Sequence, residues 1–304
     1  MQDLHQIRMD MCDIGCRIYN RQFAAANDGN ITVRVGENEV LCTPTMQCKG
    51  FLKPDDIALM DMTGKQLSGK KPRSSEALLH LEIYRQRNDV QSVVHCHPPH
   101  ATAFAIAREA IPQCILPEVE VFLGEVPITK YETPGSQVFA ETILPFVHKT
   151  NVMILANHGT VSYAGTVEHA YWLTEILDSY CRMLMLAHQL GHIAYLGETK
   201  TRELLVLKEK MGYADPRNTK AFDDCDICAN EVFRDSWVDA GVAQRAFARP
   251  PAMNAPNNGT SGANATSSTT NDVNEERLVK MIAQEVVRQL AANRDWWRSE
   301  PKQQ

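Results

Sequence analysis

The stretch SVVHCHPPH, residues 92–100, runs from a β-branched segment into two histidines and stops at two prolines. Successive side chains of a strand point to opposite faces, so His95 and His97 would share one face and Cys96 would take the other. Two imidazoles on one face can bind the same metal ion. The alternative is a pair of ordinary polar residues at a strand end. A lone HxH pattern favours this alternative over a metal site.

A third histidine strengthens the metal interpretation. The stretch VMILANHGT, residues 152–160, has the apolar run of a buried strand and then His158, and Gly159 would allow a sharp exit of the chain. A catalytic zinc needs about three protein ligands and an open position. His158 is therefore the best candidate for a third ligand beside His95 and His97, and polar residues at strand ends stay the alternative. Six other histidines fall in predicted helices or loops and are interpreted as ordinary surface or core residues: His80, His100, His148, His169, His188 and His192.

The periodicity around these motifs predicts an α/β fold. Strands are expected from about residue 30 and over 39–43, 56–61, 92–97 and 152–157, and helices over 3–26, 75–87, 98–109, 136–149 and 166–191. Several strand–strand connections have the length of hairpins. We therefore expect a single domain with a central mixed, largely antiparallel sheet flanked by helices.

Charge and cysteine content exclude several classes of protein. The 304 residues carry a formal charge of -6 without a basic cluster, which argues against a nucleic acid or an anionic membrane surface as partner. No apolar run is long enough to span a membrane, and the N-terminus has no signal-peptide pattern. The nine cysteines lack paired spacing and are interpreted as reduced thiols, so we expect a cytoplasmic protein.

A carboxylate and several small polar residues could accompany the metal. In KKPRSSEALLHLEIY, Ser74 or Ser75 is expected to cap a helix, with Glu76 beside it. A helix N-terminus also favours anions, and a phosphate held there would leave Glu76 near the reacting carbons of a substrate. A simple capped helix is the alternative. Two further turns offer small or polar groups, namely Gly29 and Asn30 in NDGN, and Thr43, Thr45, Lys49 and Gly50 in CTPTMQCKGF.

Taken in order, five short motifs resemble the class II aldolase/adducin family. They are GNITVR (29–34), TPT (43–45), SSE (74–76), HCH (95–97) and NHG (157–159), and the resemblance runs from about residue 3 to 214. The L-fuculose-1-phosphate aldolase type is the most similar. The resemblance implies one α/β domain, commonly assembled as a fourfold-symmetric homotetramer with active sites between subunits.

The resemblance also implies roles for the residues named above. His95, His97 and His158 would bind Zn²⁺, and Glu76 would be the acid/base that approaches the metal when substrate is absent. The phosphate of a sugar phosphate would be held by Gly29, Asn30, Thr45, Ser74 and Ser75. The implied reaction cleaves L-fuculose 1-phosphate or L-rhamnulose 1-phosphate to dihydroxyacetone phosphate and L-lactaldehyde. The alternatives are a pentulose-phosphate 4-epimerase of the same family and a non-enzymatic, adducin-like oligomerisation module.

The chain departs from the fuculose aldolase pattern at three places. Leu116 falls where that type has a tyrosine, so the second proton carrier must be another residue; Glu118 is the preferred candidate, and Glu120, Tyr131 and Tyr213 are the others. Met46 replaces a glycine after TPT. Asp28 lies beside Gly29, and a carboxylate near a phosphate is unfavourable unless it points away.

Composition divides the C-terminal part of the chain. We expect the catalytic domain over residues 1–214, an extension over 215–249, a flexible linker over 250–274 and an amphipathic helix over 275–297. That helix resembles the encapsulation peptides of bacterial microcompartment cargo, which implies a shell protein or a second cargo as partner. A helix that folds back or self-associates is the alternative. Cys225 and Cys228 have zinc-ligand spacing, but no second pair accompanies them and they are interpreted as surface thiols.

Overall fold

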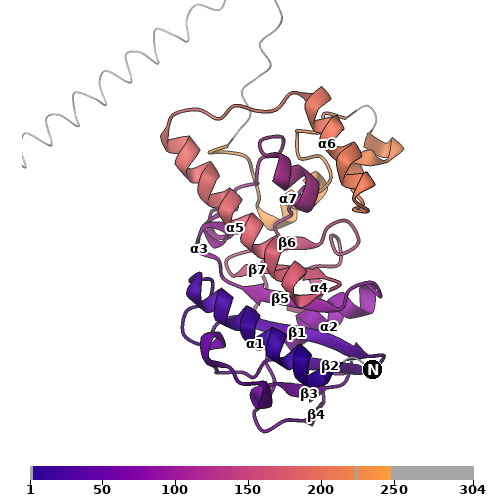
Figure 1. Ribbon diagram of the computed structural model, residues 1–304. Helices are drawn as coiled ribbons and strands as arrows, with labels where there is room; N and C mark the ends of the chain where they lie inside the picture. The colour runs from indigo at the N-terminus through magenta and orange to yellow at the C-terminus, as the bar shows by residue number, and fades with distance from the viewer. Residues whose placement is uncertain (1–2, 223–224, 248–304) are drawn as a thin grey trace, which may run out of the picture. The chain divides into compact units, whose positions relative to one another are not determined.

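Seven strands form the centre of the protein. The computed structural model describes residues 3–222 and 225–247, and its sheet has the order β4-β3-β2-β1-β5-β7-β6 with each neighbouring pair antiparallel (Figure 1). The strands are β1 (Asn30–Gly36), β2 (Glu39–Cys42), β3 (Ala58–Met60), β4 (Gln66–Ser68), β5 (Ser92–Cys96), β6 (Val152–Leu155) and β7 (Gly159–Ala164). The expected antiparallel sheet is confirmed. The strands β4 and β7 were not anticipated from the sequence.

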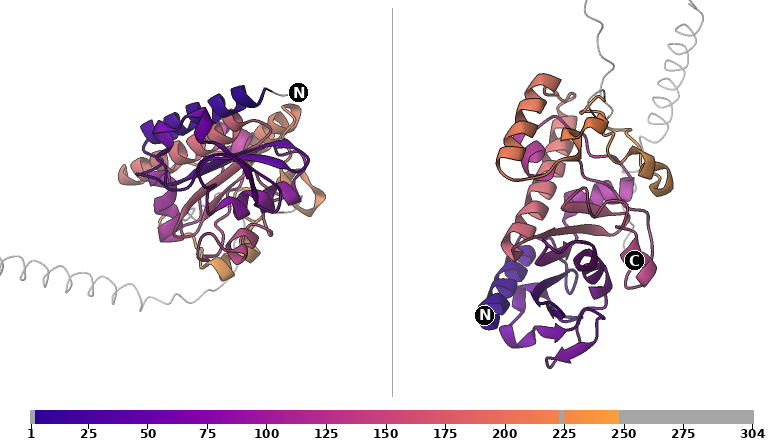
Figure 2. Two further views of the ribbon diagram at one scale, coloured as in Figure 1. Left: turned by 90° about the horizontal axis from the view of Figure 1, so that it is seen from below. Right: turned by 90° about the vertical axis from the view of Figure 1, so that its right-hand side faces the viewer.

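Helices cover both faces of the sheet (Figure 2). The α-helices are α1 (Leu4–Asn20), α2 (Ala77–Gln86), α3 (Pro99–Ala107), α4 (Gln137–Glu141), α5 (Val167–Gln189), α6 (Glu198–Lys210) and α7 (Arg234–Ala240). A π-helical turn, η3 (Val119–Leu123), follows α3, and 3-10 turns occupy Lys49–Phe51, Pro54–Asp56, Pro216–Asn218 and Lys220–Phe222. Among the described residues, no helix combines the length and apolar character that a membrane crossing needs.

The alternation of side chains along β5 separates two cores. Val93 is buried with α2 and α4 residues on one face, whereas Val94 and Cys96 are buried with α1 and α5 residues on the other. His95 alternates with these two, so it faces the α2 side, as the period-two pattern predicts. The strand ends there because Pro98 and Pro99 cannot donate to a ladder, and α3 begins at Pro99. The HCH motif therefore lies at one edge of the α2-side core.

Two helix predictions need correction. Neither Ser74 nor Ser75 is the N-cap of α2: Glu76 takes that position without a side-chain cap, and the Ser74 hydroxyl accepts the N–H of Glu76 at 3.3 Å. The backbone of Ser74 is already engaged, because its N–H donates to the Thr43 carbonyl. The helix expected over 136–149 is wrong beyond Glu141, and Pro145 gives the reason since it lacks the donor a helix interior requires.

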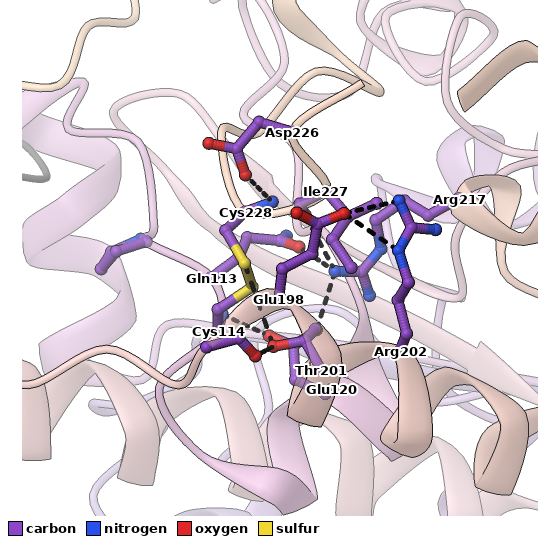
Figure 3. Close-up of a disulfide and its surroundings, with 12 residues drawn as sticks. Gln113, Cys114, Glu120, Glu198, Thr201, Arg202, Arg217, Asp226, Ile227 and Cys228 are labelled. Atoms are coloured by element: carbon purple, nitrogen blue, oxygen red, sulfur yellow. Dashed lines mark hydrogen bonds and ion pairs between the residues drawn. A yellow bond between two sulfur atoms is a disulfide. The ribbon is translucent and has the colours of Figure 1, made fainter. Parts of the chain in front are cut away.

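The cysteine prediction was also wrong. Cys114 and Cys228 form a disulfide that joins positions 114 residues apart (Figure 3). Cys228 is buried against Leu205 and Ile227, so only Cys225 of the CDIC pair is a free, partly exposed thiol. The pairing was not visible in the sequence because it depends on the tertiary contact between residues 225–228 and the segment before η3. This contact holds part of the C-terminal extension on the domain.

A buried ion network lies beside the disulfide (Figure 3). The Arg217 guanidinium pairs with Glu120 at 2.7 Å and with Asp215 at 3.0 Å, and Lys208 pairs with Asp215 at 2.9 Å. All four side chains are at most 5% exposed. Burial costs each ion its hydration, so the network is stable only while every partner is present. The described residues of the extension, 215–222 and 225–247, are therefore an integral part of the domain. The predicted linker (250–274) and amphipathic helix (275–297) lie outside the described residues.

Candidate metal centre

Three imidazoles meet at the edge of the sheet. His95 is in β5, His97 follows that strand directly, and His158 occupies the turn between β6 and β7. The Nε2 atoms of His95 and His97 are 3.2 Å apart, and one nitrogen of each of the three rings lies within 4.8 Å of the others. The antiparallel pairing of β5 with β7 brings His158, 61 positions after His97, into this cluster.

Two glycines permit the close approach of these strands. A Cβ on Gly159 would lie 2.5 Å from Cδ2 of His97 and 2.6 Å from the carbonyl oxygen of Cys96, so no larger residue fits there. The expected reason for Gly159, a sharp exit of the chain, is not the one found: Asn157 carries the positive φ of that turn, 53°. Gly29 has a φ of 74°, and its Cβ would lie 2.8 Å from the carbonyl oxygen of His95.

The outer nitrogens of the three rings differ in their contacts. Nδ1 of His95 lies 2.8 Å from the Thr160 carbonyl, and Nδ1 of His97 lies 3.5 Å from a carboxylate oxygen of Asp28. Nδ1 of His158 is buried without a hydrogen-bond partner among the described residues. Outer contacts of this kind orient metal ligands and fix their tautomers. The carboxylate of Asp28 therefore points toward His97.

Burial keeps two of these imidazoles neutral. Desolvation, and then the neighbouring histidines, lower the pKa of His97 to about 4, and desolvation followed by His95 lowers the pKa of His158 to about 4. A neutral imidazole has the free lone pair that a metal ion requires. The two rings are thus in the binding form at neutral pH.

Glu76 faces the same cluster. Its carboxylate oxygens lie 3.2 Å from Nε2 of His95 and 3.6 Å from Nε2 of His158, and the amide of Asn30 donates to it at 3.1 Å. Burial acts to raise the pKa of the Glu76 carboxyl, but the two imidazoles and Asn30 together hold that pKa well below its usual range. The side chain is an oriented carboxylate, 19% exposed. The link from Asn30 to Glu76 was not anticipated, because the sequence offered Asn30 only as an anion ligand.

The loops proposed for the phosphate lie side by side. An antiparallel bridge pairs Pro44 with Arg73, the Thr45 N–H donates to the Pro72 carbonyl at 2.9 Å, and the Ser74 N–H donates to the Thr43 carbonyl at 3.0 Å. This bridge places TPT against SSE. Ser75 is exposed, Thr45 is partly exposed and Ser74 is buried.

Lys49 lies beneath this region. Its ammonium donates to the carbonyls of Asn27 and Gln47 at 2.8 and 2.6 Å, and burial lowers its pKa to about 8. Because two of its donors are used on backbone carbonyls, Lys49 stabilises the turn before Gly29 and the turn after Thr45.

The candidates for a second proton carrier are dispersed. Glu118 is exposed just before η3, and Glu120 is fully engaged with Arg217 and the Cys114 N–H, so its role is structural. Tyr131 is 50% exposed, and Tyr213 packs its ring against Phe122 and His169. Within the described residues, no hydrogen bond or ion pair joins these side chains to the three histidines.

The donor set fits a divalent transition metal. Three imidazole nitrogens with a carboxylate beside them match the ligands that Zn²⁺ takes in catalytic sites, and the partly exposed His97 leaves the cluster open on one side. A metal bound there would be held by residues of β5 and of the β6–β7 turn, with α2 presenting Glu76.

Comparison with known proteins places the chain in a family. Residues 9–185 match the model of the class II aldolase and adducin N-terminal domain. The chain is 35% identical over 172 residues to an L-fuculose phosphate aldolase of Methanocaldococcus jannaschii, covering 56% of this chain and 92% of that protein. It is 31% identical over 208 residues to a 3-oxo-tetronate 4-phosphate decarboxylase of Haemophilus influenzae, covering 67% and 98%.

Solved structures share the fold. An L-fuculose 1-phosphate aldolase superposes with a TM-score of 0.62 at 24% identity, covering 68% of this chain and 97% of that one. YgbL of Klebsiella pneumoniae, described as a candidate aldolase, epimerase or decarboxylase, superposes with a TM-score of 0.62 at 28% identity, covering 67% and 100%. Fold, cluster and matches define a metal-dependent carbon–carbon lyase of the class II aldolase type. The chain belongs to the class II aldolase and adducin family.

Proposed function

We propose that the protein cleaves a 6-deoxyketohexose 1-phosphate, either L-fuculose 1-phosphate or L-rhamnulose 1-phosphate, to dihydroxyacetone phosphate and L-lactaldehyde. The observation that carries the proposal is the convergence of three imidazoles with the Glu76 carboxylate at one sheet edge. Relatives named L-fuculose phosphate aldolase support this substrate class. In this proposal His95, His97 and His158 hold one Zn²⁺, whose charge would stabilise negative charge on the substrate oxygens.

Glu76 is proposed to move the proton at carbon. Oriented by Asn30, it would deliver a proton to the carbon that loses its carbon–carbon bond. A second carrier must accept the proton of the hydroxyl group that becomes the aldehyde oxygen. Glu118 is exposed on its own subunit, so we assign it this role from a neighbouring subunit of a homotetramer.

The phosphate is proposed to bind at the paired loops TPT and SSE. Thr45 and Ser75 offer accessible hydroxyls, and Gly29, Asn30 and Ser74 would complete the cradle with backbone or buried polar groups. The Asp28 carboxylate does not oppose this because it faces His97.

Decarboxylation of a 3-oxo acid 4-phosphate is a second candidate. The relatives named 3-oxo-tetronate 4-phosphate decarboxylase include one matched over 208 residues, and Leu116 removes the tyrosine expected in a fuculose aldolase. Loss of carbon dioxide forms no aldehyde, so no hydroxyl group has to be deprotonated there and a missing carrier would be tolerated. The metal and Glu76 would serve both reactions in the same way.

In the first experiment the zinc-loaded enzyme is given, in separate assays, L-fuculose 1-phosphate, L-rhamnulose 1-phosphate, 3-oxo-tetronate 4-phosphate and a pentulose phosphate. Dihydroxyacetone phosphate, measured with a coupled reductase, is expected from one or both deoxyketose phosphates, and activity should disappear with a strong chelator and return with Zn²⁺. Release of carbon dioxide from 3-oxo-tetronate 4-phosphate, without cleavage of the sugars, would instead establish the decarboxylase. Interconversion of pentulose phosphates without free aldehyde would establish the epimerase.

Substitution of Glu76 separates metal binding from chemistry. Glu76→Gln should keep its zinc and lose about 10²–10⁴-fold in kcat, because an amide cannot carry the proton. His97→Ala, the matched variant, should lose metal as well as activity. Metal content by atomic emission and kcat under saturating substrate are the measurements. Near-normal turnover of Glu76→Gln would remove Glu76 from its role, and full zinc in His97→Ala would reject the ligand set.

Residues 275–297 are proposed to direct the enzyme to a microcompartment shell or a second cargo, with residues 250–274 as linker. The support is the apolar face of Leu278, Ile282, Val286 and Leu290 and the reactivity of an aldehyde product, which a shell would retain. Deletion from residue 252 should leave zinc content and turnover intact and abolish co-purification with shells. Unchanged co-purification would refute this assignment.

A further inference from the structure

In the part of the chain that the structure describes, His158 lacks the outer contact that the other two histidines of the cluster have at Nδ1. His95 and His97 each have an outer contact at Nδ1, with Thr160 and Asp28, whereas Nδ1 of His158 has no partner among the described residues. Its ring packs at 5.5 Å from the ring of Phe139, which restrains its position but supplies no hydrogen bond. Apart from the Glu76 carboxylate, 3.6 Å from its Nε2, the direction of the His158 imidazole therefore depends on the backbone of the β6–β7 turn.

That turn is held by Arg108. Asn157, which precedes His158, has a φ of 53°, and its side-chain oxygen accepts a hydrogen bond from Nε of Arg108 at 3.1 Å and another from Nη2. The Asn157 N–H donates to the carbonyl of Ala105 in α3. The guanidinium donates two hydrogen bonds to one oxygen, so it fixes Asn157 more tightly than a single donor would.

Arg108 is itself held by the C-terminal extension. It ends α3 with φ 50° and ψ 38°, a left-handed conformation that a non-glycine residue keeps only where its surroundings impose it. Its Nη1 donates to the carbonyl of Ala240, and its own carbonyl accepts the N–H of Ala243 at 3.0 Å. The Ala110 N–H donates to the Ala243 carbonyl, also at 3.0 Å. One arginine thus contacts both the metal-ligand turn and the extension.

Glu109, the residue after Arg108, holds residues 245–247 of the extension. One carboxylate oxygen of Glu109 accepts the N–H groups of Arg245, Ala246 and Phe247 at 2.7, 3.0 and 3.2 Å. Glu109 is 5% exposed, and Phe247 stacks on Phe104 of α3 with centroids 5.3 Å apart. Residues 240–247 lie beyond the family match of 9–185. They are nevertheless bound by Arg108 and Glu109, and Arg108 also contacts the turn that carries His158.

We propose that Arg108 is a positioning residue that couples the docking of residues 240–247 to the orientation of His158, so that loosening this segment weakens metal binding. The proposal rests on the proposed function only in requiring that His95, His97 and His158 hold a divalent ion. Arg108 acts through Asn157 and has no part in the reaction itself.

The test uses the full-length protein loaded with Co²⁺ or Zn²⁺. Arg108→Gln removes the hydrogen bonds from the guanidinium to Asn157 and Ala240. We expect about tenfold faster release of zinc to a chelator and a changed visible spectrum of the cobalt form. Arg202→Gln is the matched control, because Arg202 also pairs through its guanidinium, with Glu198 on α6. This control should match the wild type in both measurements.

A second variant tests the role of the extension. Glu109→Gln weakens the acceptor of the three N–H groups without touching the Arg108 side chain, and it should also speed zinc release. If both act through one docked segment, the double variant should release zinc no faster than Arg108→Gln alone. Additive effects would show two independent contributions and would overturn the coupling.

The remaining outcomes are distinguishable. A folded Arg108→Gln protein with wild-type zinc release and cobalt spectrum would overturn the proposal. Should that variant fail to fold, Asn157→Gly keeps the left-handed turn available and removes only the amide, and its wild-type behaviour would overturn the proposal equally. If the wild type held no ion, or if His97→Ala released it at the same rate, the proposed function would fail together with the coupling. Stoichiometric metal with no effect of Arg108→Gln refutes the coupling alone.

Discussion

At the scale of single residues, small and polar side chains determine whether the histidines can meet. Gly159 and Gly29 leave space for His97 and for the backbone of His95, and Asn30 and Asp28 each hold one member of the cluster by a polar contact. If the histidines bind a metal as proposed, these neighbours matter as much as the ligands, because a displaced imidazole binds a metal poorly.

Gly159→Ala tests the steric requirement. The added methyl group would overlap His97 and the Cys96 carbonyl, and the backbone atom cannot move without disturbing the pairing of β5 with β7. We expect a loss of about 1–3 kcal/mol in the free energy of unfolding and weaker zinc binding. Gly165→Ala is the control, since a Cβ there meets nothing within 4 Å. Urea denaturation and zinc titration measure both effects. Wild-type values for Gly159→Ala would contradict the close approach.

At the scale of elements, the segment before α7 is held on the domain by the buried carboxylate of Glu125. Glu125 accepts the N–H groups of Val232 and Phe233 at 3.1 and 3.2 Å, and burial raises its pKa to about 7 despite these two hydrogen bonds and the attraction of Arg217. A carboxyl with a pKa raised in the folded state binds more protons there than in the unfolded chain. Its contribution to stability is therefore complete below about pH 4.5 and is lost as the pH rises through 7.

Glu125→Gln should remove this pH dependence. Between about pH 5 and 8 the free energy of unfolding of the wild type should fall relative to that of the variant by about 2–3 kcal/mol, because the amide does not ionise. Urea denaturation at several pH values gives the slope for each protein. Glu209→Gln, at an exposed position of α6, should leave the slope unchanged. Parallel pH profiles for the wild type and Glu125→Gln would contradict the raised pKa.

At the scale of the described domain, the disulfide Cys114–Cys228 closes a long stretch of chain. It joins the segment before η3 to the extension across 114 residues, so it restricts the unfolded chain considerably. The described residues of the extension are thus fixed by a covalent bond, an ion network and the contacts of Glu109 and Glu125.

Cys228→Ser should lower the free energy of unfolding by about 2–4 kcal/mol under oxidising conditions. A reducing agent should lower the stability of the wild type by a similar amount and leave the variant unaffected. Cys225→Ser is the matched control, because Cys225 is a free thiol three residues away. Denaturation midpoints with and without the reductant are compared. A wild type insensitive to reduction would refute the stabilising role of the bond.

The sequence by itself determined the antiparallel α/β architecture, the five strands with clear period-two or apolar runs, and the five motifs that identify the family. These features are local: hydrophobic periodicity and short motifs are written along the chain. It also indicated which three histidines could form one cluster, since two lie on one face of a strand and the third ends another.

The tertiary structure alone decided the features that join distant segments. Strand β4 has only three residues, and β7 mixes polar and apolar residues, so neither has a clear sequence pattern. Both are strands because they pair with neighbouring strands of the sheet. The disulfide, the burial of Glu120 with Arg217, the contact of Asn30 with Glu76 and the grip of Arg108 on Asn157 each connect residues far apart in sequence. No periodicity encodes such contacts, because they depend on how whole elements pack and not on the spacing of residues within one of them.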